Sequence, residues 1–146
     1  MELQELYDIA LNFRKAIMEA KWEREFYSPS DRMNNFPGGC CDDSADLFGY
    51  YLREKYNITS KQGNGIYRAR NSYNTRNHAF TILEDGTIID LTADQFPAFS
   101  DCPDGIYVGP QISFHRRLDR KTKGDHCDIT RNERLWHDYE AISKYL

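Results

Sequence analysis

Apolar side chains recur every three or four positions over residues 2–24, the spacing that gathers them on one face of an α-helix. They are Leu3, Leu6, Ala10, Phe13, Ile17 and Ala20. The turn-forming segment Tyr27–Ser30 follows, and then a loop that ends in Gly38 and Gly39. We therefore predict a first helix that packs against the core, and a loop whose glycines allow close approach of the backbone.

A second helical pattern starts directly after these glycines and runs from about Cys41 to Tyr56. Its apolar positions are Cys41, Ala45, Phe48 and Leu52, spaced four, three and four residues apart. This phase predicts that Cys41 lies on the buried face of the helix, in its first turn.

A third helical pattern closes the chain. Its apolar positions are Leu135, Tyr139, Ile142 and Leu146. Thr130, with Glu133 three residues later, has the form of a capping box and predicts where this C-terminal helix begins.

Between the second and the third helix the pattern favours short strands. The predicted strands are Ile66–Ala69, His78–Glu84, Thr87–Ala93, Ile106–Val108 and Gln111–Arg117. Helices at both ends of a run of antiparallel strands predict an α+β fold. With 146 residues, we expect one domain spanning 1–146.

The hairpin between the second and third strands tests whether His78 and Asp90 can meet. A two-residue turn at 85–86 would send their side chains to opposite faces of the sheet. A three-residue loop at 84–86 would put them on one face as diagonal neighbours. That loop requires its last residue in the left-handed region, which Gly86 supplies. We therefore predict the three-residue loop.

Composition and charge narrow the function classes. The net charge of −4 disfavours nucleic acid as a partner, because phosphate binding needs a basic surface. The basic stretch His115–Lys123 is interpreted as a solvated strand edge and loop. No apolar run is long enough for a membrane span, and the N-terminus lacks a signal sequence. We expect a cytoplasmic protein, or one delivered by a route that the sequence does not show, with its four cysteines reduced.

Cys41 is the candidate nucleophile. The orphan N–H groups and positive dipole end of a helix N-terminus favour a thiolate there. His78 and Asp90 follow it in strand-like segments. In this order the three residues are typical of a catalytic triad, in which the histidine takes the thiol proton and the carboxylate orients the imidazole.

The motifs around these residues resemble the transglutaminase-like branch of the papain-like cysteine enzymes. Gly39-Cys40-Cys41-Asp42-Asp43-Ser44-Ala45-Asp46-Leu47 is similar to its nucleophile segment, His78-Ala79-Phe80 to its His-Ala-aromatic segment, and Asp90-Leu91-Thr92 to its Asp-x-Thr segment. The resemblance covers roughly residues 36–96. It implies a papain-like core and a peptidase, glutamine deamidase or acyl transferase that acts through a thioester at Cys41, with no cofactor and with a protein or peptide as substrate.

Several assignments around the nucleophile stay open at this point. Cys40 is the rival nucleophile, although its helical phase suits packing less well than that of Cys41. The Cys41 backbone N–H is the first expected donor to the oxyanion, and the side-chain amides of Asn35 and Gln95 are the candidate second donors. The aspartates of the first helical turn, Asp42, Asp43 and Asp46, are expected to face water. As like charges beside the thiol they oppose its ionisation.

Two other classes of function compete with the enzyme. One is a non-catalytic binding or adaptor module on the same fold, with the ten tyrosines as a partner surface. The other is a zinc site, disfavoured because the candidate ligands lack C-x-x-C or H-x-x-x-H spacing. Those ligands are Cys102, Cys127, His115, His126 and His137. His115 and His137 are then interpreted as surface or partly buried residues.

Overall fold

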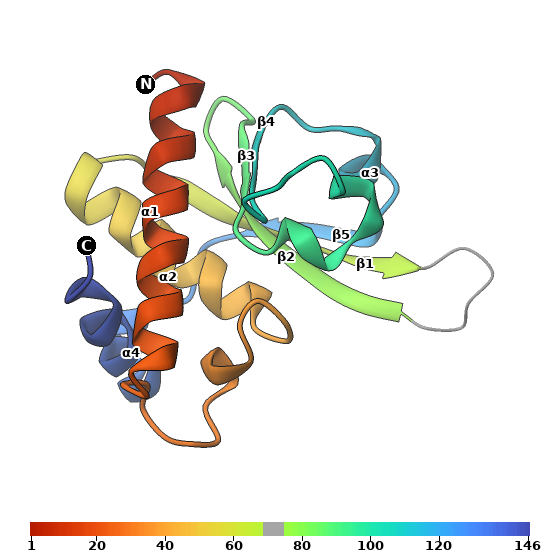
Figure 1. Ribbon diagram of the computed structural model, residues 1–146. Helices are drawn as coiled ribbons and strands as arrows, with labels where there is room; N and C mark the ends of the chain where they lie inside the picture. The colour runs from red at the N-terminus through yellow and green to blue at the C-terminus, as the bar shows by residue number, and fades with distance from the viewer. Residues whose placement is uncertain (69–74) are drawn as a thin grey trace.

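The computed structural model describes residues 1–68 and 75–146, which form four α-helices and a five-stranded antiparallel sheet (Figure 1). The helices are α1 (Leu3–Trp22), α2 (Cys41–Tyr56), α3 (Ser113–Arg116) and α4 (Glu133–Ser143). The strands are β1 (Ser60–Arg68), β2 (Thr75–Leu83), β3 (Ile88–Asp90), β4 (Tyr107–Gly109) and β5 (Asp119–Gly124), in the spatial order β4-β3-β2-β1-β5. The predicted α+β class is confirmed.

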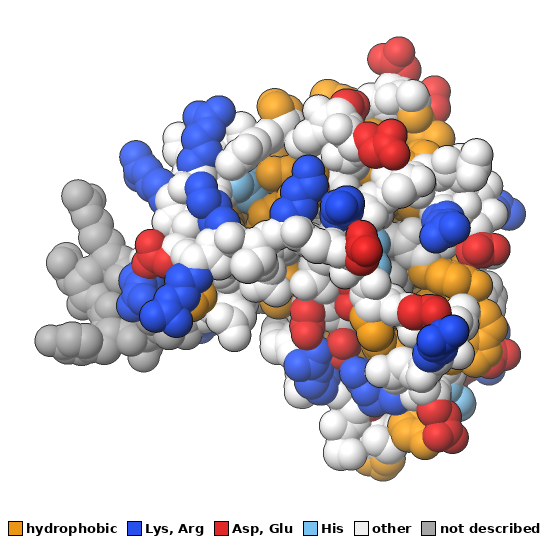
Figure 2. Space-filling model, turned by 180° about the vertical axis from the view of Figure 1, so that it is seen from behind, with side chains coloured by type: hydrophobic (Ala, Val, Ile, Leu, Met, Phe, Trp, Pro, Cys, Tyr) orange, Lys and Arg blue, Asp and Glu red, His pale blue; other side chains and the backbone are white. Residues whose placement is uncertain are grey.

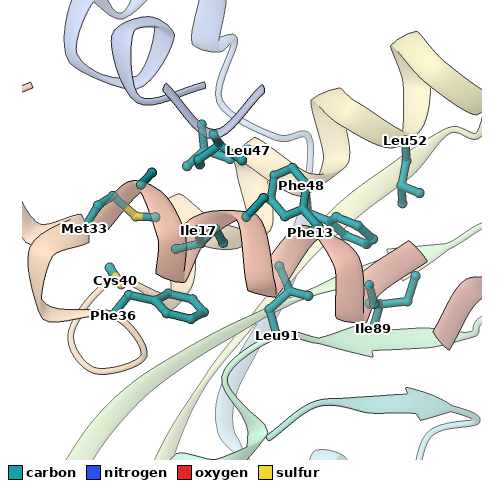
Figure 3. Close-up of a cluster of buried hydrophobic side chains, with 14 of the residues drawn as sticks. Phe13, Ile17, Met33, Phe36, Cys40, Leu47, Phe48, Leu52, Ile89 and Leu91 are labelled. Carbon is teal, nitrogen blue, oxygen red and sulfur yellow. The ribbon is translucent and has the colours of Figure 1, made fainter. Parts of the chain in front are cut away.

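The sheet separates two buried layers. On one face, α1, α2 and α4 gather, and the segment after β3 covers the other face (Figure 1). The larger cluster joins Phe13 and Ile17 of α1 to Phe48 and Leu52 of α2 and to Ile89 of β3 (Figure 3). Each such side chain contributes roughly 1.5–3 kcal/mol by leaving water, so this cluster fixes α2 on the sheet.

Successive residues of β2 face these two layers in turn. The Thr81 hydroxyl donates to the Ala45 carbonyl of α2 at 3.3 Å, whereas Phe80 packs in the smaller cluster on the opposite face. His78, two residues before Phe80, shares the face of that smaller cluster. The N-terminus of the α2 helix and His78 line the same cleft.

The β2–β3 hairpin has the predicted three-residue loop. Thr81 pairs with Ile89, and the Leu83 N–H donates to the Thr87 carbonyl at 2.9 Å, which leaves residues 84–86 as the loop. Gly86, its last residue, has φ +90°. This conformation disfavours residues with a Cβ, so the glycine selects the register that brings His78 and Asp90 to one face.

The strand predicted at Ile106–Val108 is β4, shifted by one residue, and β3 ends at Asp90 instead of at the predicted Ala93. Two further strand predictions needed larger corrections. The strand predicted at Ile66–Ala69 is β1, which begins six residues earlier, at Ser60, and Ala69 lies outside the described residues. The strand predicted at Gln111–Arg117 is wrong, because Ser113–Arg116 forms the short helix α3. This turn buries His115 against Phe80 and Phe99, at ring-centroid distances of 5.1 and 5.8 Å, so the prediction of a surface or partly buried His115 is also wrong.

The second half of the basic stretch His115–Lys123 agrees with the prediction of a solvated strand edge. Residues 119–124 form the exposed edge strand β5, beside β1. Acidic and basic side chains are interspersed over the face of the molecule shown in Figure 2. Among the described residues, no helix combines the length and the apolar character needed to cross a bilayer.

The start of the C-terminal helix was misplaced by the capping-box prediction. Residues 129–131 form a separate 3₁₀ turn, whose N-terminus is capped by the Asp128 side chain, which accepts from Thr130 N at 3.1 Å. Helix α4 therefore begins after this turn, and Asn132 is its cap, accepting from Leu135 N at 3.0 Å.

Candidate active site

Cys41, the first residue of α2, lies half-buried in a cleft of about 520 Å³. The first N–H groups of an α-helix have no partner within it, so those of the Cys41 turn are available as donors at this end. The thiol lies 3.7 Å from the Asn77 carbonyl of β2. Other residues that line the cleft are Arg32, Gly39, Asn64, His78 and Gln95.

His78 and Asp90 form a fully buried pair beside this thiol. His78 Nε2 and Asp90 Oδ2 are 2.5 Å apart, and neither side chain is exposed. The other carboxylate oxygen, Oδ1, accepts from the backbone N–H of Thr92 at 3.1 Å. A short Asp-x-Thr turn thus fixes the carboxylate, and the carboxylate fixes the imidazole.

A carboxylate and a thiol both influence the pKa of His78. Burial alone lowers the pKa of the imidazole, but the charge and hydrogen bond of Asp90, with a smaller contribution from Cys41, raise that pKa to about 9. Nδ1, the ring nitrogen not used by Asp90, is buried and has no hydrogen-bond partner among the described residues. It is the nitrogen available for proton exchange with Cys41.

Aromatic rings hold the imidazole in this orientation. Phe96 packs edge-on against His78 at a centroid distance of 4.5 Å, and Phe80 and Phe114 lie at 5.7 and 5.9 Å. The rings exclude water from the His78–Asp90 pair, and exclusion of water strengthens their interaction.

The two adjacent cysteines have different environments, and the helical phase assigned them wrongly. Cys40 is completely buried among core side chains (Figure 3), whereas Cys41 faces the cleft. Cys40 is the N-cap, with φ −139° and ψ 28°, so the periodicity of the helix does not apply to it. Burial raises the pKa of the Cys40 thiol to about 12. Cys40 is therefore a packing residue, and all four cysteines are free thiols.

The prediction that the acidic first turn faces water is wrong for two of its three residues. Asp43 and Asp46 are buried. Arg32 lies 2.6 Å from Asp42 and 3.0 Å from Asp43, so one arginine meets two of the aspartates. Burial raises the pKa of Asp43, and the arginines that face it limit this rise.

A second arginine comes from the far end of the chain. Arg134 of α4 pairs with Asp43 and with Asp31, each at 3.0 Å. The two arginines offset the negative charge that would otherwise oppose a thiolate at Cys41. Arg134 also ties the start of α2 to α4, which sequence spacing alone did not indicate.

The structure separates the two candidate oxyanion donors. Gln95 lines the cleft, and its amide donates to the Pro37 carbonyl. Asn35 is exposed and does not line the cleft. Asn64, which the sequence did not single out, also lines the cleft and donates to the Gln62 side chain at 3.2 Å. Its neighbour in sequence, Gly65, pairs with His78 across β1 and β2, and only this register shows that Asn64 is close to the site.

The residues considered as zinc ligands are spread over the fold. His137 Nε2 lies 3.0 Å from the Glu25 carbonyl, and His115 Nδ1 accepts from Ile112 N at 3.2 Å. Burial lowers the pKa of His115 to about 4, so this imidazole is neutral. In the part of the chain that the structure describes, no three acidic, histidine or cysteine side chains are grouped to hold a metal ion.

Comparisons of this chain with protein-family models, with characterised proteins and with solved structures found no match. The assignment of a function therefore depends on the motifs and on the geometry of the site.

Proposed function

We propose that this protein is a cysteine-nucleophile hydrolase with a papain-like, transglutaminase-like core, in which Cys41, His78 and Asp90 act as a triad on an amide or related acyl bond. The observation that carries the proposal is the two-sided placement of His78. One ring nitrogen, Nε2, lies 2.5 Å from the Asp90 carboxylate, and the other, Nδ1, has no hydrogen-bond partner among the described residues. Cys41 also helps to raise the pKa of this imidazole.

The reaction follows from these positions. The thiol proton of Cys41 passes to His78 Nδ1, which gives an ion pair that the raised pKa of the imidazole favours, and the Cys41 thiolate then attacks the carbonyl carbon. Backbone N–H groups at the start of α2 stabilise the oxyanion, with Gln95 as the side-chain donor that lines the cleft. His78 then protonates the departing amine, leaving a thioester. Water attacks the thioester, its proton returns to His78 Nδ1, and the carboxylic acid leaves as the Cys41 thiol is restored.

The cleft favours a polar acyl donor such as a peptide or a glutamine side chain. Amide and guanidinium groups of Asn64, Gln95 and Arg32 line it, and these groups hydrogen-bond to amides. Peptidase, glutamine deamidase and acyl transferase share the acyl-enzyme and differ in the group that accepts the acyl chain. Water is the acceptor that we propose, which makes the protein a peptidase or a deamidase.

Alkylation by iodoacetamide across a pH series, followed by peptide mass spectrometry, tests the triad. Cys41 should react at pH values where exposed Cys127 and buried Cys40 stay unmodified, and His78→Ala should abolish this selectivity. His137→Ala is the matched control, since His137 is exposed, contacts the Glu25 carbonyl and the Tyr27 ring, and does not line the Cys41 cleft.

Equal and slow reaction of Cys41 and Cys127 would overturn the enzyme proposal and favour the adaptor. Incubation with glutamine-containing peptides then separates the chemistries. Conversion of glutamine to glutamate indicates a deamidase, chain cleavage a peptidase, and mass gain from an added amine an acyl transferase.

A further inference from the structure

Away from the Cys41 cleft, a serine, a histidine and an aspartate form a second chain of hydrogen bonds. Ser60 Oγ is 2.8 Å from His126 Nε2, and His126 Nδ1 is 2.9 Å from Asp46 Oδ1. Ser60 begins β1, Asp46 lies in α2, and His126 follows β5, so three separate segments converge there. Cys41, His78 and Asp90 take no part in these contacts.

The hydrogen bonds determine which ring nitrogen of His126 carries the proton. An ionised carboxylate only accepts, so Nδ1 must donate to Asp46. In the neutral ring Nε2 is then the basic nitrogen and accepts from the Ser60 hydroxyl. Gln62 Nε2 also donates to Asp46 Oδ1, at 2.8 Å, and holds the carboxylate in place. This is the arrangement in which an imidazole removes a serine proton.

A glycine inside α2 makes room for the imidazole. A Cβ on Gly49 would lie 2.3 Å from His126 Nε2 and 2.5 Å from its Cδ2, so any other residue at this position would force the ring to shift. A glycine in a helix interior costs roughly 0.5–1 kcal/mol relative to alanine. The helix therefore gives up stability at the position where a methyl group would displace His126.

The three residues line a second cleft, of about 440 Å³, together with Arg53 and Cys127. The His126 and Asp46 side chains are 14% and 8% exposed, so the pair is shielded while the serine still faces the cleft. We propose that Ser60, His126 and Asp46 form a second nucleophilic site, which takes ester-type acyl donors on Ser60.

The step balances within these groups and water. Ser60 Oγ attacks the acyl carbonyl carbon, its proton moves to His126 Nε2, and the same proton passes to the departing alcohol. The Arg53 guanidinium, which lines the cleft, is the cation available to the developing oxyanion. Water then attacks the ester on Ser60, His126 takes its proton, and the acid leaves as the Ser60 hydroxyl is restored.

A fluorophosphonate probe, which loses fluoride when a serine attacks its phosphorus, tests the site in the native chain. Peptide mapping should place the adduct on Ser60. Exposed Ser143, whose hydroxyl donates to the Tyr139 carbonyl at 2.7 Å, serves as the internal reference and should stay unlabelled. An adduct that is absent from Ser60, or that forms there no faster than on Ser143, overturns the proposal.

Variants then separate nucleophilic activation from a purely structural cross-link. His126→Asn and Gly49→Ala should slow labelling of Ser60 by about 100-fold or more, the loss expected when a general base is removed. Ser143→Ala should leave the rate unchanged. Circular dichroism verifies that each variant is folded. Labelling that persists in folded His126→Asn would also overturn the proposal, because His126 would then only join α2 to β1.

Discussion

Helix α2 takes part in two imidazole sites that differ in their access to water. At its N-terminus Cys41 lies beside the His78–Asp90 pair. This pair is completely buried, with 2.5 Å between His78 Nε2 and Asp90 Oδ2. Further along, Asp46 holds His126 at 2.9 Å beside a cleft, with side chains that are 8% and 14% exposed. Both pairs join one imidazole to one carboxylate, yet their surroundings give the carboxylates different tasks.

The difference shows how burial changes what a carboxylate does for a histidine. Around His78, aromatic rings exclude water, so the charge of Asp90 outweighs the effect of burial and raises the pKa of the imidazole. The His126–Asp46 pair is less deeply buried, with side chains that are 14% and 8% exposed. There the carboxylate acts mainly by orientation, because its hydrogen bond decides which ring nitrogen faces Ser60.

Matched substitutions of the two carboxylates should give the largest difference. Asp90→Asn removes the charge from a fully buried pair and should lower the free energy of unfolding by about 3–5 kcal/mol. Without Asp90, burial should bring the pKa of His78 below its ordinary value. Asp46→Asn should lower the free energy of unfolding by about 1.5–3 kcal/mol, the range for a hydrogen bond to a charged group, because the remaining amide oxygen still accepts from His126 and Gln62.

Urea unfolding at neutral pH measures both effects, and alkylation of Cys41 gives a second readout. Selective alkylation should be lost in Asp90→Asn and kept in Asp46→Asn. Equal losses of stability would contradict the role that we assign to burial.

The pH dependence of stability separates the pairs next. The pKa of His78 is about 9 in the folded chain, above its ordinary value of about 6.5. This group therefore stabilises the fold fully below about pH 6.5, and that contribution is lost as the pH rises through about 9. The expected loss is on the order of 3 kcal/mol.

The His78→Gln variant isolates this effect, because the pH-dependent loss should be smaller in the variant by that amount. Burial raises the pKa of Asp138 to about 8, so Asp138 also loses its stabilising proton as the pH rises through this value. Its contribution stays in both proteins and cancels in the difference. Urea unfolding between pH 6 and pH 9 provides the measurement, and parallel curves for the two proteins would refute the assignment.

Local sequence patterns predicted those parts of the Cys41 site that depend on residues close together in the sequence. The glycine at the end of a three-residue loop fixed the hairpin register, and alternation along β2 and β3 then put His78 and Asp90 on one face. The start of α2 at Cys41 was likewise predicted from a local pattern. The phase of α2 failed for Cys40 because a cap residue lies outside the helical periodicity.

Contacts between distant segments were not predictable from spacing. Arg134 pairs with Asp43 across 91 positions, and His126 reaches Asp46 across 80. Neither arginine nor histidine stands in a motif that indicates its partner. The acidic turn therefore suggested a solvated surface, whereas the fold surrounds it with cations.

Removal of the distant arginine tests how much the Cys41 site depends on those cations. Arg134→Gln should lower the free energy of unfolding by about 2 kcal/mol, because Asp43 and Asp31 each lose a charged hydrogen bond while Arg32 still meets Asp43. The uncompensated negative charge should also move selective alkylation of Cys41 to higher pH. Labelling of Ser60 should not change.

Arg131→Gln is the control for this substitution. Its side chain is 88% exposed and pairs with Asp128 at 3.6 Å, so its effect on stability should stay within about 0.5 kcal/mol. An unchanged alkylation profile in folded Arg134→Gln would show that α4 stabilises the fold without tuning the thiol.

The smallest effect is expected at the glycine on which the buried pair depends. Gly86 has φ +90°, but apart from its chain neighbours no described residue has an atom within 4 Å of a Cβ added there. Gly86→Ala should therefore lower the free energy of unfolding by only about 1 kcal/mol, the conformational cost of a left-handed residue. Gly86→Asn should lose less, since asparagine tolerates this region.

Selective alkylation of Cys41 decides whether the hairpin keeps its register in these variants. A strained but intact three-residue loop keeps His78 beside Asp90, so the selectivity should persist in both. A collapse to a two-residue turn would send the two side chains to opposite faces and abolish the selectivity. Gly49→Ala contrasts with both, because it introduces a steric clash with His126 rather than backbone strain. The buried site thus depends on a backbone conformation, and the second site on space beside a helix.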